Sequence, residues 1–385
     1  MQQSDGIRGG KGWRRGTKLV LALGLLVAIG AAVAVKLSST GSDPTKRPVV
    51  GVILPQTGLL GQIGQFEKEG FELAFDHLRA EGRLTFDAKF EDGRSDKKAV
   101  AAAANKLVDL DGARLLITST TGASLAAQPI AQRADIAQLA FGMGSEIARG
   151  SPSTVRFYIG VEEEARAIIE FVGKRFKDKK VAILHGSEAQ WTAAIKDIYR
   201  PQLDAVLKQS CFVEQYDVKD KDFRAHITKM REAGAQVVIV LGYGFEYGPL
   251  MAQLHETGLA KQAAIVGGWG FIYTPVPTDQ LEGVFVAGPM YVYDRNNAGQ
   301  AFDKAYLAKY GHRPNFDAAF AYELAKRIPD VLDLVKSAGT QGLKKELVRQ
   351  GSREGVFGKY HFADDGNMIV ETAVGVYKGG TIVRE

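Results

Sequence analysis

Apolar runs alternate with helical patterns along this chain of 385 residues, and the alternation limits the possible folds more than any other feature. The first run, Val49–Leu54 (VVGVIL), is continuously apolar, as is typical of a strand buried on both faces of a parallel sheet. The segment after it places apolar residues at helical spacing from Phe66 to Leu78. Strands that alternate with helices form right-handed βαβ units on a mainly parallel sheet, so the predicted fold class is α/β.

The pattern occurs twice. In the first set we predict strands near residues 49–54, 86–90, 115–117 and 136–141; in the second set, near 181–184, 211–216, 237–241 and 263–267. Two doubly wound, Rossmann-like lobes follow, and a cleft between two such lobes is a usual place for a small ligand. After Val284 we predict a strand, helices at 298–310, 317–335 and 340–349, and an antiparallel tail in which Asp365-Gly366 marks a hairpin turn.

The first 34 residues have the three-part layout of a secretory signal peptide. A basic segment ends at Lys18, an apolar run spans Leu19–Val35, and small residues lie at 32–34. The apolar run is at the short limit for crossing a bilayer, so an uncleaved membrane anchor is the alternative. Residues 35–47, polar and broken by Gly and Pro, are predicted to form a linker. The sequence therefore predicts an exported, periplasmic protein, tethered to the inner membrane if the leader is retained.

The net charge of +5 does not indicate a nucleic-acid partner. Most of that charge lies in residues 1–34, which carry five basic residues and one acid, whereas nucleic-acid binding needs a basic face on the folded domain. The single cysteine, Cys211, cannot form an internal disulfide, and we expect a buried structural thiol.

No motif for catalysis or for a cofactor is found. The glycines Gly58, Gly61 and Gly64 fit neither the dinucleotide fingerprint nor the phosphate loop. The six histidines show no HExxH pattern of a zinc site, and Ser119 lacks the GxSxG elbow that exposes a nucleophile. We therefore predict a binding protein that is not an enzyme and has no cofactor or metal.

The candidate anion site is the turn after the strand at 115–117. Its residues Ser119, Thr120, Thr121 and Gly122 lead directly into a helix of small residues. Such a turn lies at the carboxyl edge of the strands, where ligands bind. The unpaired N–H groups of the first helical turn, together with the hydroxyls, favour a small anion such as a carboxylate. The alternative is that the hydroxyls only cap the helix.

Aromatic residues follow three predicted strands of the second lobe. They are Trp191, Tyr243 and Trp269, each near the carboxyl edge of its strand. Together they would line one wall of a cleft, and separate packing roles are the alternative.

Five segments in order resemble the type I periplasmic ligand-binding proteins, specifically the branched-chain amino acid and amide binding components of ATP-driven importers. The segments are VVGVILPQTGLLGQIGQFEKEGFELAFDHL, TTGASLAAQPIAQRADIAQLAF, KDKDFRAHITKMREAGAQVVIV, AYLAKYGHRPNFDAAFAYELAK and GVFGKYHFADDGN. The resemblance covers nearly all of residues 48–378. It implies two lobes that close by a hinge on a ligand. The implied lobes are 48–157 with 287–350 and 158–286 with 351–385, joined by three crossover strands near 156–159, 284–289 and 351–358.

The resemblance also implies which residues contact the ligand. In the amino acid binders of this family, the turn that matches Ser119–Gly122 holds the ligand carboxylate, and Thr121 falls on the serine of the family pattern. A second hydroxyl normally comes from the turn that matches Gly142–Ser145. In this chain Gly144 stands at that position, and Met143 beside it belongs to the predicted site.

Other positions depart from the family pattern. Ile63 replaces the usual loop aromatic, and Gln190 and Trp191 stand where Tyr-Gly is usual. In the amino acid binders, an acid after the strand that matches Ile265–Gly268 pairs with the ligand ammonium, whereas this chain has Trp269 there and no acid beside it.

This last departure bears on the ligand. Burying an ammonium without a countercharge costs several kcal/mol. Glu246 would be the nearest substitute, but we expect this helix-start carboxylate to face solvent. Aromatic acids and branched 2-oxo acids therefore fit better than zwitterionic amino acids.

The predicted function is an extracytoplasmic solute-binding protein that closes on a small carboxylate or amide with an apolar or aromatic body. Its partners would be that ligand and an ABC transporter permease, with the protein a monomer. The alternative is a membrane-tethered ligand sensor or regulator that uses the same closing fold.

Overall fold

The computed structural model describes residues 47–272 and 276–385. The predicted leader and all but the last residue of the predicted linker lie outside the described residues. In the part of the chain that is described, no helix has both the length and the apolar character needed to cross a membrane.

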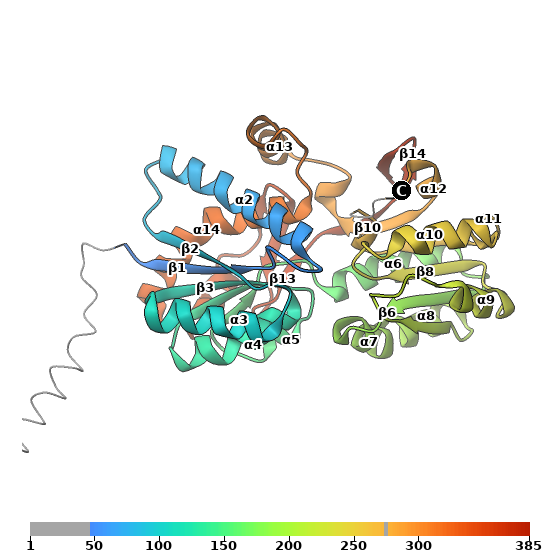
Figure 1. The fold of residues 1–385 in the computed structure, drawn as a ribbon, viewed down its shortest axis with the longest axis horizontal. Coiled ribbons are helices and arrows are strands. Elements are labelled where there is room, and N and C mark those ends of the chain that lie inside the picture. Colours follow the sequence, from blue (N-terminus) through green and yellow to red (C-terminus); the bar gives the residue numbers. More distant parts are fainter. Residues whose placement is uncertain (1–46, 273–275) are drawn as a thin grey trace, which may run out of the picture. The chain divides into compact units, whose positions relative to one another are not determined.

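Five parallel strands form the first sheet, in the order β2-β1-β3-β4-β5. Figure 1 labels β1, β2 and β3 of this sheet. The strands are β1 (Val49–Leu54), β2 (Asp87–Asp92), β3 (Ala113–Ser119), β4 (Ala137–Phe141) and β5 (Thr154–Arg156). The helices of this lobe are α2 (Gly61–Ala80), α3 (Lys97–Asn105) with the π-helical turn η1 (Lys106–Leu110), α4 (Thr121–Arg133), α5 (Glu146–Arg149), α13 (Asn297–Tyr310), α14 (Phe316–Ala338) and α15 (Leu343–Arg349). Helices α2 and α14 pack together, and α3 packs on α4. Val52 and Ile53 of β1 face two different cores, as the continuous apolar run predicts.

Seven strands form the second sheet, in the order β15-β14-β10-β9-β8-β6-β7. The strands are β6 (Val181–Gly186), β7 (Phe212–Tyr216), β8 (Val237–Leu241), β9 (Ala264–Gly267), β10 (Phe285–Pro289), β14 (Thr372–Lys378) and β15 (Thr381–Arg384). The helices are α6 (Val161–Arg175), α7 (Ala189–Ala194), η2 (Ile195–Tyr199), α8 (Arg200–Leu207), α9 (Arg224–Glu232), α10 (Tyr247–Glu256), α11 (Leu259–Gln262), η3 (Trp269–Ile272), α12 (Thr278–Leu281) and η4 (Met290–Val292). Strands β6 to β10 are parallel, whereas β14 and β15 are antiparallel. Cys211, just before β7, is buried as expected.

The two sheets share one topology. The order β7-β6-β8-β9-β10 repeats the order β2-β1-β3-β4-β5, so each lobe reverses its strand order once. The reversals fall between β1 and β3 in the first lobe and between β6 and β8 in the second. Ligands of doubly wound sheets bind at the carboxyl ends of the strands at such a switch point. The topology therefore marks the turns after β1, β3, β6 and β8 as the place for a site.

A small antiparallel sheet packs on the first lobe, whereas we expected its residues in the second lobe. Its strands are β11 (Arg353–Gly355), β12 (Gly358–Phe362) and β13 (Met368–Val370), and Asp365-Gly366 lies in the β12–β13 turn as predicted. We expected residues 351–385 to belong to the second lobe. Instead Phe357 stacks on Phe320 of α14, with ring centroids 4.0 Å apart, and α15 packs on β12. Because this aromatic packing holds 353–370 on the first lobe, the last passage between the lobes comes at the β13–β14 junction, not at 351–358.

Arg156 anchors the first passage between the lobes. Its side chain is buried, and its Nε donates to Asn367 Oδ1 at 2.6 Å. Nη1 donates to the Tyr158 carbonyl at 2.7 Å, and Nη2 lies 3.7 Å from Glu163 Oε2 at the start of α6. One guanidinium therefore joins the end of β5, the β12–β13 turn and the first helix of the second lobe.

Candidate functional site

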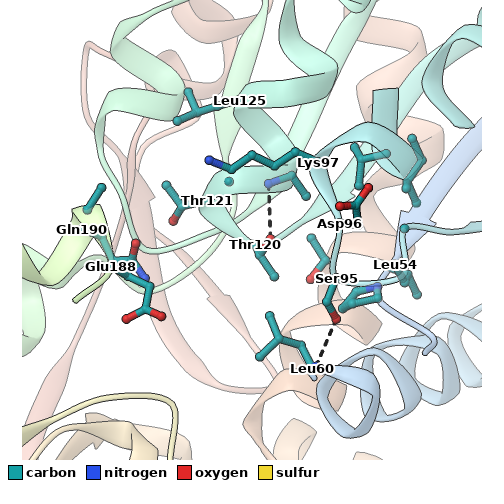
Figure 2. Close-up of a pocket in the computed structure, with 18 of the residues that line it drawn as sticks. Leu54, Leu60, Ser95, Asp96, Lys97, Thr120, Thr121, Leu125, Glu188 and Gln190 are labelled. Carbon is teal, nitrogen blue, oxygen red and sulfur yellow. Dashed lines mark hydrogen bonds between the residues drawn. The ribbon is translucent and has the colours of Figure 1, made fainter. Parts of the chain in front are cut away.

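Two neighbouring cavities lie at the switch points of the two sheets. The outer chamber, about 330 Å³, is shown in Figure 2, and its lining includes Leu54, Leu60, Ser95, Asp96, Lys97, Thr120, Thr121, Leu125, Glu188 and Gln190. The inner chamber, about 40 Å³, is lined by Ile63, Glu67, Ser119, Thr120, Thr121, Phe141, Gly142, Met143, Tyr158, Gln190, Tyr243 and Trp269. The chambers share Ser119, Thr120, Thr121, Gln190 and Tyr243. Both lobes therefore contribute to each chamber.

The turn between β3 and α4 combines a helix cap with hydrogen-bond donors that have no partner inside the helix. Thr120 Oγ1 accepts from the Ala123 N–H at 3.4 Å, so this hydroxyl caps α4. Thr121 Oγ1 accepts from the Gly144 N–H at 3.2 Å, which leaves its O–H free to donate toward the chambers. Thr121 and Gly122 are the first residues of α4, so their N–H groups have no partner inside the helix. The same turn therefore holds a helix cap and donors of the kind that suit an anion.

Thr120 has a strained backbone. Its φ of 74° and ψ of 151° lie in a region that is used almost only by glycine. Holding a β-branched residue there costs about 1–3 kcal/mol, and such strain is found mainly at functional sites. The strain is consistent with a turn whose shape is set by binding.

Lys97 adds a positive charge to this turn, which sequence reasoning missed. Its side chain extends from the start of α3 toward Thr121 and the start of α4 (Figure 2). A Cβ built on Gly122 would lie 3.0 Å from Lys97 Cε and 3.9 Å from Lys97 Nζ. The ammonium therefore reaches the amino end of α4 and adds its positive charge to that of the helix dipole. Nothing in the sequence pattern around Asp96 showed which way the side chain of Lys97 would point.

The second lobe supplies an aromatic wall. The Trp269 N–H donates to Glu164 Oε2 at 2.9 Å, and its indole Nε1 donates to Met143 Sδ of the first lobe at 2.7 Å. Tyr243 accepts a hydrogen bond from Gln190 Nε2 at 3.2 Å. Burial raises the pKa of Tyr243 to about 12, so its hydroxyl stays protonated at neutral pH. This wall offers an apolar surface with hydroxyl and amide groups at its edge.

Two predicted site residues do not line either chamber. Trp191, 1% exposed, lies behind Tyr243, with the ring centroids 4.7 Å apart in a T-shaped contact. Gly144 contributes its N–H to Thr121 but no chamber surface. The structure thus places both residues one layer behind the predicted ligand contacts. The other predicted residues, from Ile63 to Trp269, all line the inner chamber.

The expectation that Glu246 faces solvent is wrong. Its side chain is fully buried and accepts hydrogen bonds from the Tyr216 hydroxyl at 2.8 Å and from two backbone N–H groups, of Tyr243 at 2.9 Å and Gly244 at 3.0 Å. The three donors satisfy the buried carboxylate. Because two of them are backbone N–H groups of the turn after β8, these bonds also fix that turn. Glu246 therefore positions Tyr243 and does not line a chamber.

Four carboxyl groups line the chambers, and none of them was a predicted site residue. Asp96, Glu146 and Glu188 line the outer chamber, and Glu67 lines the inner chamber. Burial, with nearby Glu246 and Asp217 adding to it, raises the pKa of Glu188 in the outer chamber to about 7. Glu67 of α2 lines the inner chamber and is 1% exposed. A signal for Glu67 existed, since it interrupts the apolar stripe of α2 one turn after Ile63.

The hydroxyl of Ser119 is already hydrogen-bonded. It donates to Glu67 Oε1 at 2.7 Å, and no histidine is found among the described residues that line either chamber. Across residues 47–272 and 276–385, no group of three or more His, Cys, Asp or Glu side chains is arranged to hold a metal ion. Two doubly wound lobes with a cavity at both switch points define a two-lobed protein that binds a small molecule.

Comparison with known proteins gives the family. The model of the periplasmic binding protein family matches residues 49–381, and the chain belongs to this family of solute-binding proteins. The family implies an extracytoplasmic location. One relative, Leu/Ile/Val-binding protein homolog 3 of Brucella melitensis, is 28% identical over 365 residues, covering 93% of this chain and 91% of the relative.

Solved structures share the fold. A solute-binding protein of an ABC transporter from Rhodopseudomonas palustris, in complex with 3,4-dihydroxybenzoic acid, aligns with a TM-score of 0.77. It is 19% identical, with 88% of this chain and 96% of that chain covered. The branched-chain amino acid binding protein LivJ of Streptococcus pneumoniae, in complex with isoleucine, aligns with a TM-score of 0.73 at 21% identity, covering 88% and 98%. These neighbours confirm the predicted two-lobed α/β fold.

Proposed function

We propose that this protein is the extracytoplasmic substrate-binding component of an ABC importer and that it binds a small carboxylate with an apolar or aromatic body. The observation that carries the proposal is the turn between β3 and α4. There the Thr121 hydroxyl, the amino end of α4 and Lys97 converge on the chambers. Hydroxyl and N–H donors beside a cation are the groups that hold a carboxylate.

The size and lining of the cavity support a small ligand with an apolar body. A volume of about 330 Å³ is at the lower end for small-molecule sites, which span about 300–1,000 Å³. Tyr243 lines both chambers from the second lobe, and Trp269 lines the inner chamber. The ligands of the neighbours, isoleucine and a dihydroxybenzoic acid, both combine a carboxylate with an apolar or aromatic body.

Contacts from both lobes support closure by a hinge. The carboxylate contacts come from the first lobe, and the aromatic wall comes from the second. A ligand that touches both lobes selects the closed arrangement, because only that arrangement gains both sets of contacts.

Titration calorimetry on the purified exported protein tests the proposal with matched probes. We expect saturable one-to-one binding of 3-phenylpropanoate or L-phenylalanine, or of their aliphatic counterparts 4-methylpentanoate or L-leucine. We expect no binding of 2-phenylethylamine or 3-methylbutylamine, which keep the body and lack the carboxylate. Tighter binding of the amines than of every carboxylate would refute the carboxylate assignment.

A further inference from the structure

A buried carboxyl group lines the inner chamber, and one of its oxygens has no hydrogen-bond partner among the described residues. Glu67 Oε1 accepts the hydroxyl of Ser119 at 2.7 Å. Glu67 Oε2 is buried and has no hydrogen-bond partner among the described residues. A buried carboxyl oxygen without a partner is costly, so this atom is suited to a donor that arrives with a ligand.

The charges around Glu67 favour a positively charged donor. Asp317 of α14 is fully buried, and its Oδ1 accepts the hydroxyl of Tyr158. Burial and the negative charge of Asp317 raise the pKa of Glu67 well above its ordinary value. No lysine, arginine or histidine is found among the described residues that line the inner chamber. A cation in this chamber would offset the repulsion between the two carboxyl groups and favour the ionised form of Glu67, whereas an anion would add to that repulsion.

Glu67 also lies next to the proposed carboxylate contacts. It bonds Ser119, which directly precedes Thr120 and Thr121 in the turn before α4. A ligand carboxylate on that turn therefore leaves the neighbouring carbon of the ligand near the inner chamber, whose volume of about 40 Å³ suits a group of a few atoms.

We propose that Glu67 is a specificity-determining residue that accepts a hydrogen bond from a positively charged nitrogen next to the ligand carboxylate. The inference rests on the proposed function and deepens it. It revises the sequence argument from Trp269, because the acid comes from α2 of the first lobe instead of the end of β9 in the second. Both charged ends of the ligand then bind to the first lobe, and Trp269 and Tyr243 of the second lobe contact its body.

Glu69 offers a matched control on the same helix. Its side chain is also buried, but its oxygens accept hydrogen bonds from Gln65 Nε2 at 2.7 Å and from the Tyr306 hydroxyl, and it lines neither chamber. Glu67→Gln and Glu69→Gln therefore each replace one buried carboxyl group on α2, and only the first removes it from the inner chamber.

The test compares L-phenylalanine with 3-phenylpropanoate, and L-leucine with 4-methylpentanoate, by calorimetry on the full exported protein. Each pair differs only in the charged nitrogen. We expect the wild type and Glu69→Gln to prefer the amino acid of at least one pair by tenfold or more. We expect Glu67→Gln to lose that preference through weaker binding of the amino acid, while the nitrogen-free acid binds as before or more tightly.

The outcomes separate this inference from the proposed function. Equal affinity of the wild type for both members of the pairs that bind overturns the role of Glu67 and leaves the carboxylate assignment intact. A preference that survives in Glu67→Gln does the same. If neither member of either pair binds the wild type, the carboxylate assignment fails, and the inference about Glu67 fails with it. Thermal unfolding of each variant shows whether a loss of affinity reflects a loss of folding.

Discussion

Replacing Thr121 with valine is the sharpest change to the proposed carboxylate contacts. Thr121 is 8% exposed and lines both chambers, and valine has nearly the same shape. Its Oγ1 accepts from the Gly144 N–H at 3.2 Å, so one O–H donor remains for the ligand. A hydrogen bond to a charged group contributes about 1.5–3 kcal/mol. We therefore expect Thr121→Val to weaken binding of a carboxylate by about 10- to 100-fold.

The same substitution leaves the Gly144 N–H without its acceptor. That loss costs about 1–3 kcal/mol of stability, so the unfolding temperature should fall while the protein stays folded. Thr121→Ser is the matched control, because it keeps the hydroxyl and loses only a methyl group. We expect the serine variant to bind within a few-fold of the wild type.

Calorimetric titration of the three proteins with the same carboxylate checks the expectation, and thermal unfolding reports their folding. An affinity of Thr121→Val within twofold of the wild type would remove Thr121 from the site. Equal weakening in the serine and valine variants would assign the effect to packing and not to the hydroxyl.

Three further changes probe the wall, the passage between the lobes and a buried acid. Trp269→Ala removes an aromatic contact from the inner chamber, and we expect the affinity for a carboxylate, measured by calorimetry, to fall about tenfold or more. Unchanged affinity would contradict the role of Trp269 in the aromatic wall. Arg156→Met leaves Glu163 buried without its partner, and we expect a loss of about 3–5 kcal/mol in urea unfolding; a loss below 1 kcal/mol would contradict the anchor. Burial raises the pKa of Glu164 from 4.5 to about 7, so the folded state holds this proton more tightly than the unfolded state. Stability should then fall by up to about 3 kcal/mol as pH rises from about 4.5 to 7, and Glu164→Gln should lack this part of the slope; identical slopes would contradict it.

The architecture could be predicted because it depends on local pattern. Continuous apolar runs such as Val49–Leu54 indicate strands buried on both faces, and the helical spacing between them gives the alternation. The hairpin at Asp365-Gly366 was also predicted, from turn chemistry. The lobe that holds this hairpin was not, since that depends on the stacking of Phe357 on Phe320, a contact between segments far apart in sequence.

The candidate site could be predicted in part. Residues at strand ends, such as Thr121, Tyr243 and Trp269, line the cavities because parallel strands bring their carboxyl ends to one edge. Carboxyl groups were harder to place. We expected Glu246 to be an exposed charge at a helix start, but it is buried and accepts hydrogen bonds from two backbone N–H groups. Glu67 looked like an ordinary member of an amphipathic helix. The sequence pattern shows on which face of a helix an acid lies, but it does not show which cavity that face lines.

A crystal structure of the protein with a bound carboxylate tests the central claim most directly. The account predicts that the carboxylate oxygens lie within hydrogen-bond distance of Thr121 Oγ1 and of the first N–H groups of α4. It also predicts that the apolar body lies against Trp269 and Tyr243. A ligand bound outside the two chambers, or with its carboxylate turned toward the aromatic wall, would contradict the account.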